Sequence, residues 1–263
     1  MNCKAAFPFR LGCTSYVLPD EILPNVRFMA DKVDDIELVL FESPERSNLP
    51  GKAAILSMQQ IAEEHDVTFS VHFPIDRKAG VVDAAERRIL RETVLEIINC
   101  TRTLPLSGYL LHFEGLGDEN DAIEVQRWTD AVDDFCDRVV PESGIDAKLV
   151  CIENLAYNPV LHRQLVDKYR FSHCIDVGHL WLYGADWRQH MKQALVNTRI
   201  IHLHGVTEQH DHQSLQSHAQ QMQLKELASM LKNFSGVLTL EVFGEADTFS
   251  SIAYFEELWR QSR

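Results

Sequence analysis

The chain alternates from end to end between short apolar runs rich in strand formers and longer segments with helical periodicity. Eight such runs are expected as strands, at residues 9–17, 35–42, 68–73, 108–113, 148–154, 171–177, 199–206 and 237–243. The run at 35–42 is almost continuously apolar, as suits a parallel strand covered on both faces. A helical segment after every strand predicts a (β/α)8 TIM barrel, organised as one domain over residues 1–263.

Helix starts are marked by capping residues. Asp83, Asn158 and Asp186 each precede a helical segment, and Pro159 suits the first helical position. The segment after Asp83 should pack on the sheet, because its apolar residues form adjacent i, i+4 rows on one face: Ile89, Thr93 and Ile97, and Leu90, Val94 and Ile98. Other helices are expected at residues 21–32, 53–65, 122–140 and 159–169. Three more are expected towards the C-terminus: one from Asp186 to about residue 196, one that ends at residue 233, and one around Ile252, Phe255 and Trp259.

A doubly wound open sheet is the competing fold. It usually carries a glycine-rich phosphate turn after the first strand, and Thr14-Ser15-Tyr16 is not such a turn. The length of 263 residues also suits one barrel of about 250 residues. The barrel is therefore preferred.

The overall charge restricts the partners that the protein is expected to have. The formal net charge is −14, without a cluster of basic residues, which argues against nucleic acid as a partner. An acidic, solvated surface accounts for this charge as well, and bound divalent cations would offset part of it. No run approaches a membrane span and no apolar leader follows a basic start, so no membrane partner is expected.

The six cysteines lie far apart without a C-x-x-C pair, which predicts a reducing, cytoplasmic location. Cys174 lies on the same strand face as Asp176, so a thiolate ligand is an alternative there. Packing as a small hydrophobic residue is the preferred interpretation for this cysteine.

Acids and imidazoles gather at the ends of the expected strands: Glu42, His72, His112, Glu153, Asp176, His202, His204 and Glu241. A lone strand histidine is more often a hydrogen-bonded core residue than a ligand. However, a core has no reason to bury so many polar groups near one another unless positive charge lies among them. The pattern therefore predicts a metal centre, which His179 joins from the start of the following helix.

The donor types narrow the choice of ion. Imidazoles and carboxylates without thiolates suit Zn, Mn, Fe or Co better than a structural zinc site or Mg alone. The candidates are too many for one ion, so two or three divalent ions are expected, with a carboxylate bridging two of them to activate water.

Taken together, these motifs resemble a known family. His72, His112, I-E-N at 152–154, D-V-G-H at 176–179, H-L-H-G at 202–205, the histidine-rich loop to His212 and L-E-V-F at 240–243 are similar to the xylose isomerase-like barrels, which include the endonuclease IV type of apurinic endonuclease. The resemblance covers essentially the whole chain.

This resemblance implies specific ligand sets, all sharing or neighbouring Glu153. One ion is expected on His72, His112 and Glu153, and a second on Glu153, Asp176, His202 and Glu241, with Glu153 bridging. A third would use His179 and His212. The family has an Asp two residues before the His212 position, where this chain has His210, so His210 and Asp211 compete for the last place.

Two reaction classes fit such a barrel. Sugar isomerases and epimerases of the superfamily use one ion, with Glu153 and Glu241 as catalytic residues that also move protons. Phosphodiesterases use the fuller set, and His72, His112 and His212 exceed what one ion requires. The six-residue His-to-Arg spacing associated with the epimerases falls on Glu208. Hydrolysis is therefore favoured, and a non-catalytic binding protein would not need an open multi-ion centre.

A closer resemblance points to a small-molecule substrate. T-S-Y-V-L-P-D-E-I-L-P-N-V at 14–26, E-L-V-L-F-E at 37–42, D-V-G-H-L at 176–180, I-H-L-H-G-V at 201–206, D-H-Q-S-L at 211–215 and T-L-E-V-F at 239–243 look like the cobamide-remodelling phosphodiesterases. This resemblance implies cleavage of the nucleotide-loop phosphodiester of adenosylcobamides to cobinamide phosphate and an α-riboside. It sets no oligomeric state.

Two further pairs lie near the expected centre. Trp181 and Tyr183 follow His179 and are candidates for stacking on a flat substrate, with helix packing as the alternative. Arg77 and Lys78 follow the third strand and are candidates for contacting phosphate, with a solvated loop as the alternative.

Overall fold

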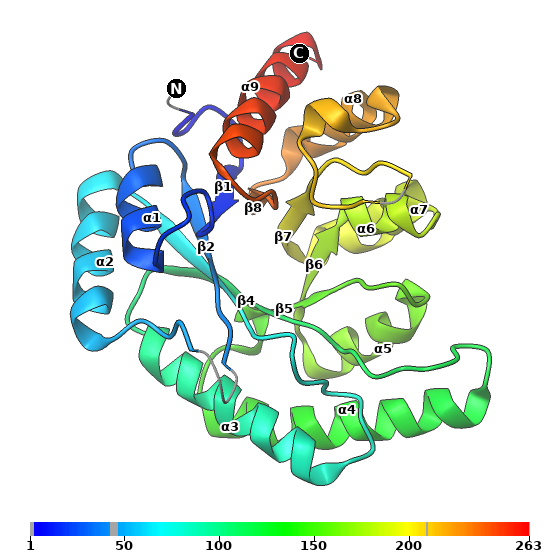
Figure 1. The fold of residues 1–263 in the computed structure, drawn as a ribbon. Coiled ribbons are helices and arrows are strands. Elements are labelled where there is room, and N and C mark those ends of the chain that lie inside the picture. The colour runs from blue at the N-terminus through cyan, green and yellow to red at the C-terminus, as the bar shows by residue number, and fades with distance from the viewer. Residues whose placement is uncertain (1–2, 43–46, 209, 263) are drawn as a thin grey trace.

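The computed structural model describes residues 3–42, 47–208 and 210–262. Eight parallel strands form a closed barrel in the order β1 to β8, and β8 pairs with β1 (Figure 1). The predicted TIM barrel is therefore confirmed. The strands are β1 Arg10–Thr14, β2 Asp35–Val39, β3 Thr68–His72, β4 Leu106–Leu111, β5 Val150–Glu153, β6 Ser172–Asp176, β7 Thr198–Leu203 and β8 Val237–Leu240.

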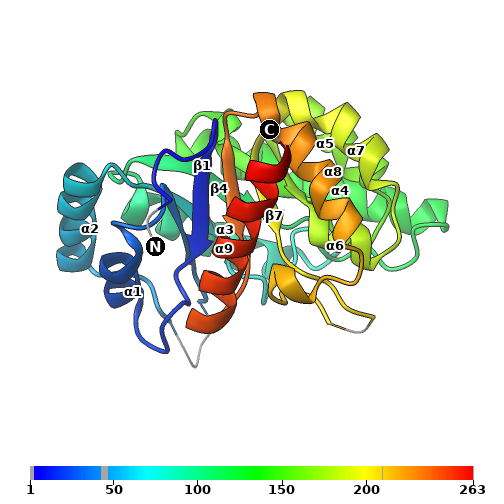
Figure 2. The ribbon, with the colours of Figure 1, turned by 90° about the horizontal axis from the view of Figure 1, so that it is seen from above.

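Helices connect the strands and lie around the outside of the barrel. In Figure 2, α1 and α2 flank one side of the strands and α5 to α8 the other. The helices are α1 Ile22–Met29, α2 Lys52–His65, α3 Ala84–Thr101, α4 Ala122–Ser143, α5 Pro159–Tyr169, α6 Val177–Leu182, α7 Trp187–Ala194, α8 Gln221–Met230 and α9 Glu245–Ser262.

The predicted caps begin the helices as expected. Asp83 accepts hydrogen bonds from the amides of the first turn of α3, Asn158 does so for α5, and Asp186 does so for α7. In α3 the row through Leu90 and Val94 is buried, whereas Ile89 in the neighbouring row is 37% exposed. Only one of the two predicted rows therefore faces the core along its whole length.

The main apolar core fills the space between the strands and the surrounding helices. A second, smaller group lies on strands β4 to β8 and is made of Leu110, Cys151, Cys174, Ile200 and Val237. It includes Cys174, as the packing interpretation predicted. All six cysteines are free thiols.

Two local predictions differ from the structure. Strand β2 ends at Val39, so Glu42 lies beyond it, in an isolated bridge with Ser47. The helix that was expected to start at His179 begins two residues earlier, at Val177. The physical cause is Asp176, whose carboxylate accepts a hydrogen bond from the His179 amide at 2.7 Å and so caps the helix at the end of β6.

Among the described helices, none combines the length and the apolar character that crossing a membrane would require.

Candidate metal centre

The barrel brings the polar residues of successive strands together at one end. His72, Glu153 and Asp176 are the last residues of β3, β5 and β6, while His112 and Glu241 directly follow β4 and β8. Parallel strands in a closed barrel all end on the same face, so these side chains share one mouth. The register pairs Asp176 with His202 on β7, which brings His202 to the same level.

Glu153 lies at the middle of this group and is 1% exposed. Its Oε2 is 3.6 Å from His72 Nε2, 3.1 Å from His112 Nε2 and 3.4 Å from His202 Nδ1. Its Oε1 is 3.3 Å from His179 Nδ1. One carboxylate therefore faces four imidazoles from different parts of the barrel.

Two further carboxylates complete the centre. Asp176 Oδ2 lies 3.2 Å from His179 Nδ1, and Glu241 Oε2 lies 3.0 Å from His202 Nδ1. Glu241 Oε2 is also 3.7 Å from His212 Nδ1, in the loop after β7.

In three groups of residues in the described part of the chain, each residue offers one nitrogen or oxygen donor atom, and these atoms lie within 4.8 Å of one another. Glu153 belongs to two of these groups. They are His72, His112 and Glu153; Glu153, Asp176, His202 and Glu241; and His179, His204 and His212. Cys174 also comes within this distance of Glu153 and His202.

The electrostatics of the centre favour positive charge within it. Burial alone would raise the pKa of Glu153, but the imidazoles of His112 and His202 outweigh burial and hold that pKa well below its usual range. In return, Glu153 overcomes the effect of burial on His112 and raises its pKa to about 9. Asp176 and Glu153 likewise raise the pKa of His179 to about 10. The carboxylates thus draw in cations, either as protons on the imidazoles or as metal ions.

Several donor atoms of the centre are placed to bind a metal ion and do not form hydrogen bonds with one another. Five of them are buried and lack a hydrogen-bond partner among the described residues: His112 Nε2, His179 Nδ1, His202 Nδ1, Glu153 Oε2 and Glu241 Oε2. His112 and Glu153 are close, but their atoms are not aligned for hydrogen bonding. A buried polar atom without a partner costs about 1–3 kcal/mol, so converging atoms of this kind fit divalent cations.

Glu37 is a residue that the sequence analysis missed. It is fully buried on β2, and its Oε2 lies 2.8 Å from His202 Nε2. This contact turns the other ring nitrogen of His202 toward Glu153 and Glu241. The signal was a glutamate inside an apolar strand, since a buried charge needs a partner. The pattern of polar residues at strand ends pointed to Glu42 instead.

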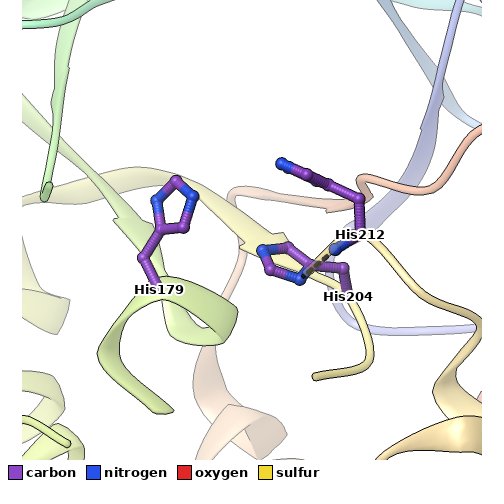
Figure 3. Close-up of side chains that lie close together, drawn as sticks. All are labelled: His179, His204 and His212. Carbon is purple, nitrogen blue, oxygen red and sulfur yellow. Dashed lines mark hydrogen bonds between the residues drawn. The ribbon is translucent and has the colours of Figure 1, made fainter. Parts of the chain in front are cut away.

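His204 was one of the strand-end candidates in the sequence, but it was absent from the ligand sets that the resemblance implies. It is fully buried, and its Nδ1 accepts a hydrogen bond from the His212 amide at 3.0 Å, drawn as the dashed line in Figure 3. Its Nε2 lies 3.2 Å from Asp176 Oδ1. Gly178 leaves the space for this ring, because a Cβ there would come within 2.1 Å of His204 Cε1.

The structure brings together the predicted site residues except Glu42 and His210. His210 is exposed and belongs to none of the donor groups found among the described residues. Asp211 is also peripheral, with its Oδ2 3.9 Å from His212 Nε2. The position beside His179 and His212, which the sequence left open between His210 and Asp211, is taken in this geometry by His204.

A cavity of about 560 Å³ adjoins the centre. It shares His112 and His179 with the donor groups and extends away from them along the loops after β3, β4 and β5. Its other walls include Lys78, Glu114, Leu155, Tyr157 and Tyr183.

Comparison with known proteins places this architecture in a family. No curated protein sequence matches the chain. Among solved structures, a D-tagatose 3-epimerase-like protein has a TM-score of 0.78 at 16% identity, over 97% of this chain and 98% of that one. Endonuclease IV from Thermus thermophilus has a TM-score of 0.71 at 14% identity, over 96% and 99%. The 3-keto-D-glucoside 4-epimerase from E. coli has a TM-score of 0.71 at 14% identity, over 95% and 99%.

At such identities these structures share the fold, and the family follows from the sequence match. A family model described as a xylose isomerase-like TIM barrel matches residues 30–261. The chain therefore belongs to the xylose isomerase-like TIM barrel family.

Proposed function

We propose that the protein is a metal-dependent phosphodiesterase that hydrolyses the nucleotide-loop phosphodiester of adenosylcobamides. The observation that carries the hydrolase assignment is the position of Glu153, whose carboxylate belongs to two donor groups at once. A shared carboxylate is how proteins hold two cations close together for phosphate chemistry. A one-ion reaction would leave His72 and His112 without a purpose in the centre.

Each donor group is proposed to bind one ion, and Zn or Mn are the expected metals. His72, His112 and Glu153 would hold the first, and Glu153, Asp176, His202 and Glu241 the second. A third would lie by His179, His204 and His212. Divalent ions in such sites activate water and offset the charge of the departing oxygen.

The chemistry assigned to the chain is a single displacement at phosphorus. A water oxygen bonds to phosphorus, and the bond from phosphorus to the riboside oxygen breaks. The riboside oxygen leaves with the proton that the attacking water gives up, and the phosphate remains on cobinamide as a monoester. Glu241 is proposed to accept the proton of the attacking water, because the neighbouring His202 holds its pKa below the usual range despite burial, so that it is a carboxylate at neutral pH.

The charge of the chain supports a compact substrate with one phosphate. A net charge of −14 should repel a polyanionic duplex at ordinary salt. Local positive charge from ions at the barrel mouth would still attract a single phosphodiester. A small molecule of the cobamide type is therefore proposed in preference to DNA.

A sugar isomerase or epimerase is the second candidate. The group of Glu153, Asp176, His202 and Glu241 has the composition needed to hold one ion beside a sugar carbonyl, with the two glutamates moving protons. Several structures with the same fold are named as epimerases or epimerase-like.

A chromatographic assay separates the two candidates. The purified protein is incubated with an adenosylcobamide and Mn or Zn, and cobinamide phosphate and the α-riboside are measured. We expect both products, at a rate above the nicking of DNA that contains abasic sites. If neither product forms with any divalent metal, while a ketose panel shows C3 epimerisation, the epimerase replaces the phosphodiesterase.

A further inference from the structure

The cavity beside the metal centre is lined by several side chains that are not among the proposed metal ligands. Its volume of about 560 Å³ lies in the range of about 300–1,000 Å³ that is typical of small-molecule sites. Because His112 and His179 form part of its wall, a ligand in it would lie next to the donor groups.

One wall offers an aromatic surface. Tyr183 ends α6, is 50% exposed, and its ring centroid lies 5.9 Å from that of His179. Trp181 of the same helix is occupied differently, since its ring contacts His218 at 4.2 Å and Trp187 at 5.9 Å. Of the two aromatic candidates in the sequence, Trp181 therefore packs within the protein, and Tyr183 remains for stacking on a ligand.

Tyr157 also lines the cavity and carries a hydrogen-bond donor. The hydroxyl of Tyr157 is buried and has no hydrogen-bond partner within the described structure. Burial first, and then the carboxylates of Glu114 and Glu153, raise the pKa of this phenol, so it keeps its proton. An edge contact with Trp128, at 5.2 Å between centroids, supports the ring. A buried hydroxyl of this kind normally finds a partner, and the described residues supply none.

The mouth of the cavity carries one cation. Lys78 is half exposed, and its ammonium nitrogen is 3.9 Å from Glu114 Oε2, too far for a strong ion pair. Arg77, the other basic candidate in the sequence, is not among the cavity's lining residues. The cavity thus joins the aromatic face of Tyr183, the neutral donor of Tyr157 and the positive charge of Lys78.

We propose that this cavity holds the riboside half of the diester, with its flat base against Tyr183 and a polar group of the riboside on the Tyr157 hydroxyl. The assignment rests on the proposed phosphodiesterase function. The corrinoid half, with its many ring substituents, is too large for the cavity and stays outside it at the barrel mouth.

Binding of the free product tests this assignment without relying on turnover. The metal-loaded protein and its Tyr183→Ala and Tyr157→Phe variants are titrated calorimetrically with the α-riboside of dimethylbenzimidazole. Loss of base stacking should weaken riboside binding about tenfold or more in Tyr183→Ala. Loss of one neutral hydrogen bond should weaken it about fivefold in Tyr157→Phe. Tyr254→Phe, on α9, is the matched control and should bind like the unaltered protein.

Each other outcome refutes one specific claim. The cavity assignment is wrong if the unaltered protein does not bind the riboside or if both variants bind it normally. It is also wrong if the two substitutions weaken the binding of cobinamide phosphate instead of the binding of the riboside. Cobamide hydrolysis is scored separately in the unaltered protein. Hydrolysis together with normal riboside binding in both variants keeps the function and removes this inference, whereas absent hydrolysis removes the function itself.

Discussion

At the scale of single residues, the carboxylate of Glu153 is where the proposed ion sites meet, so its histidine neighbours should be sensitive to substitution. We expect His72→Ala or His112→Ala to reduce turnover to below about a tenth while the protein stays folded. Each change removes a proposed ligand from an open mouth without emptying much core volume. Activity assays with circular dichroism check both effects, and His65→Ala at the end of α2 is the control.

Glu37 is expected to act through His202 rather than by touching the substrate. Glu37→Gln should lower metal affinity by about 10–100-fold, because the amide no longer holds His202 as a charged partner does. Metal affinity is measured by calorimetry. If Glu37 had a purely structural role, its substitution would not change this affinity.

Asp35→Asn is the matched control for Glu37. Asp35 is equally buried on β2 but bonds to Thr68 and Ser70, away from the donor groups. The Asp35→Asn substitution should reduce the stability of the protein without changing its metal affinity. Equal loss of affinity in both variants would show that the positioning role is wrong.

At the scale of elements, three histidines lie buried where α5, β6 and α7 meet. The ring centroids of His162, His173 and His190 are 5.8–6.5 Å apart. Within the part of the chain that the structure describes, five of their ring nitrogens lack a hydrogen-bond partner. Burial lowers the pKa of His173 and His190 to about 4 and that of His162 well below its usual range, with Arg163 adding to the effect. The cluster is therefore neutral at pH 7.

This cluster predicts that stability falls as the pH is lowered from about 6.5 to about 4. In that window the unfolded chain takes up protons on these histidines and the folded protein does not, so acid favours unfolding. Each of His173 and His190 can contribute up to about 3 kcal/mol across the full window. Denaturant unfolding at a series of pH values measures the slope.

The slope should become shallower in His190→Leu and stay unchanged in His65→Ala, whose side chain is only half buried. An unaltered slope in His190→Leu would assign the acid sensitivity to other groups.

At the scale of the whole molecule, metal ions should stabilise the barrel because their proposed ligands come from strands across its mouth. At a free metal concentration of about 100 times Kd, one site adds about 2.7 kcal/mol, equivalent to a rise in Tm of roughly 5–10 °C. Thermal unfolding with and without a chelator measures this shift. Metal analysis of the protein should find two or three ions, and a single ion would favour the epimerase.

The sequence by itself determined the architecture and most of the candidate centre. The alternation of apolar strands with helices is a local property, and the capping residues Asp83, Asn158 and Asp186 act on their own helices, so these features were predictable. Residues that end parallel strands must share one face of a barrel, which is why His72, Glu153 and Asp176 could be grouped without coordinates.

Only the tertiary structure decided which side chains meet inside the barrel. Glu37 and His202 are 165 positions apart and touch because the sheet closes on itself. His204 enters the centre, and His210 stays outside it, because of the path of the loop after β7, where His212 adopts a positive φ of 49°. Periodicity reports the face on which a residue lies. Contacts across the barrel also depend on strand register and closure, which the pattern of a single strand does not contain.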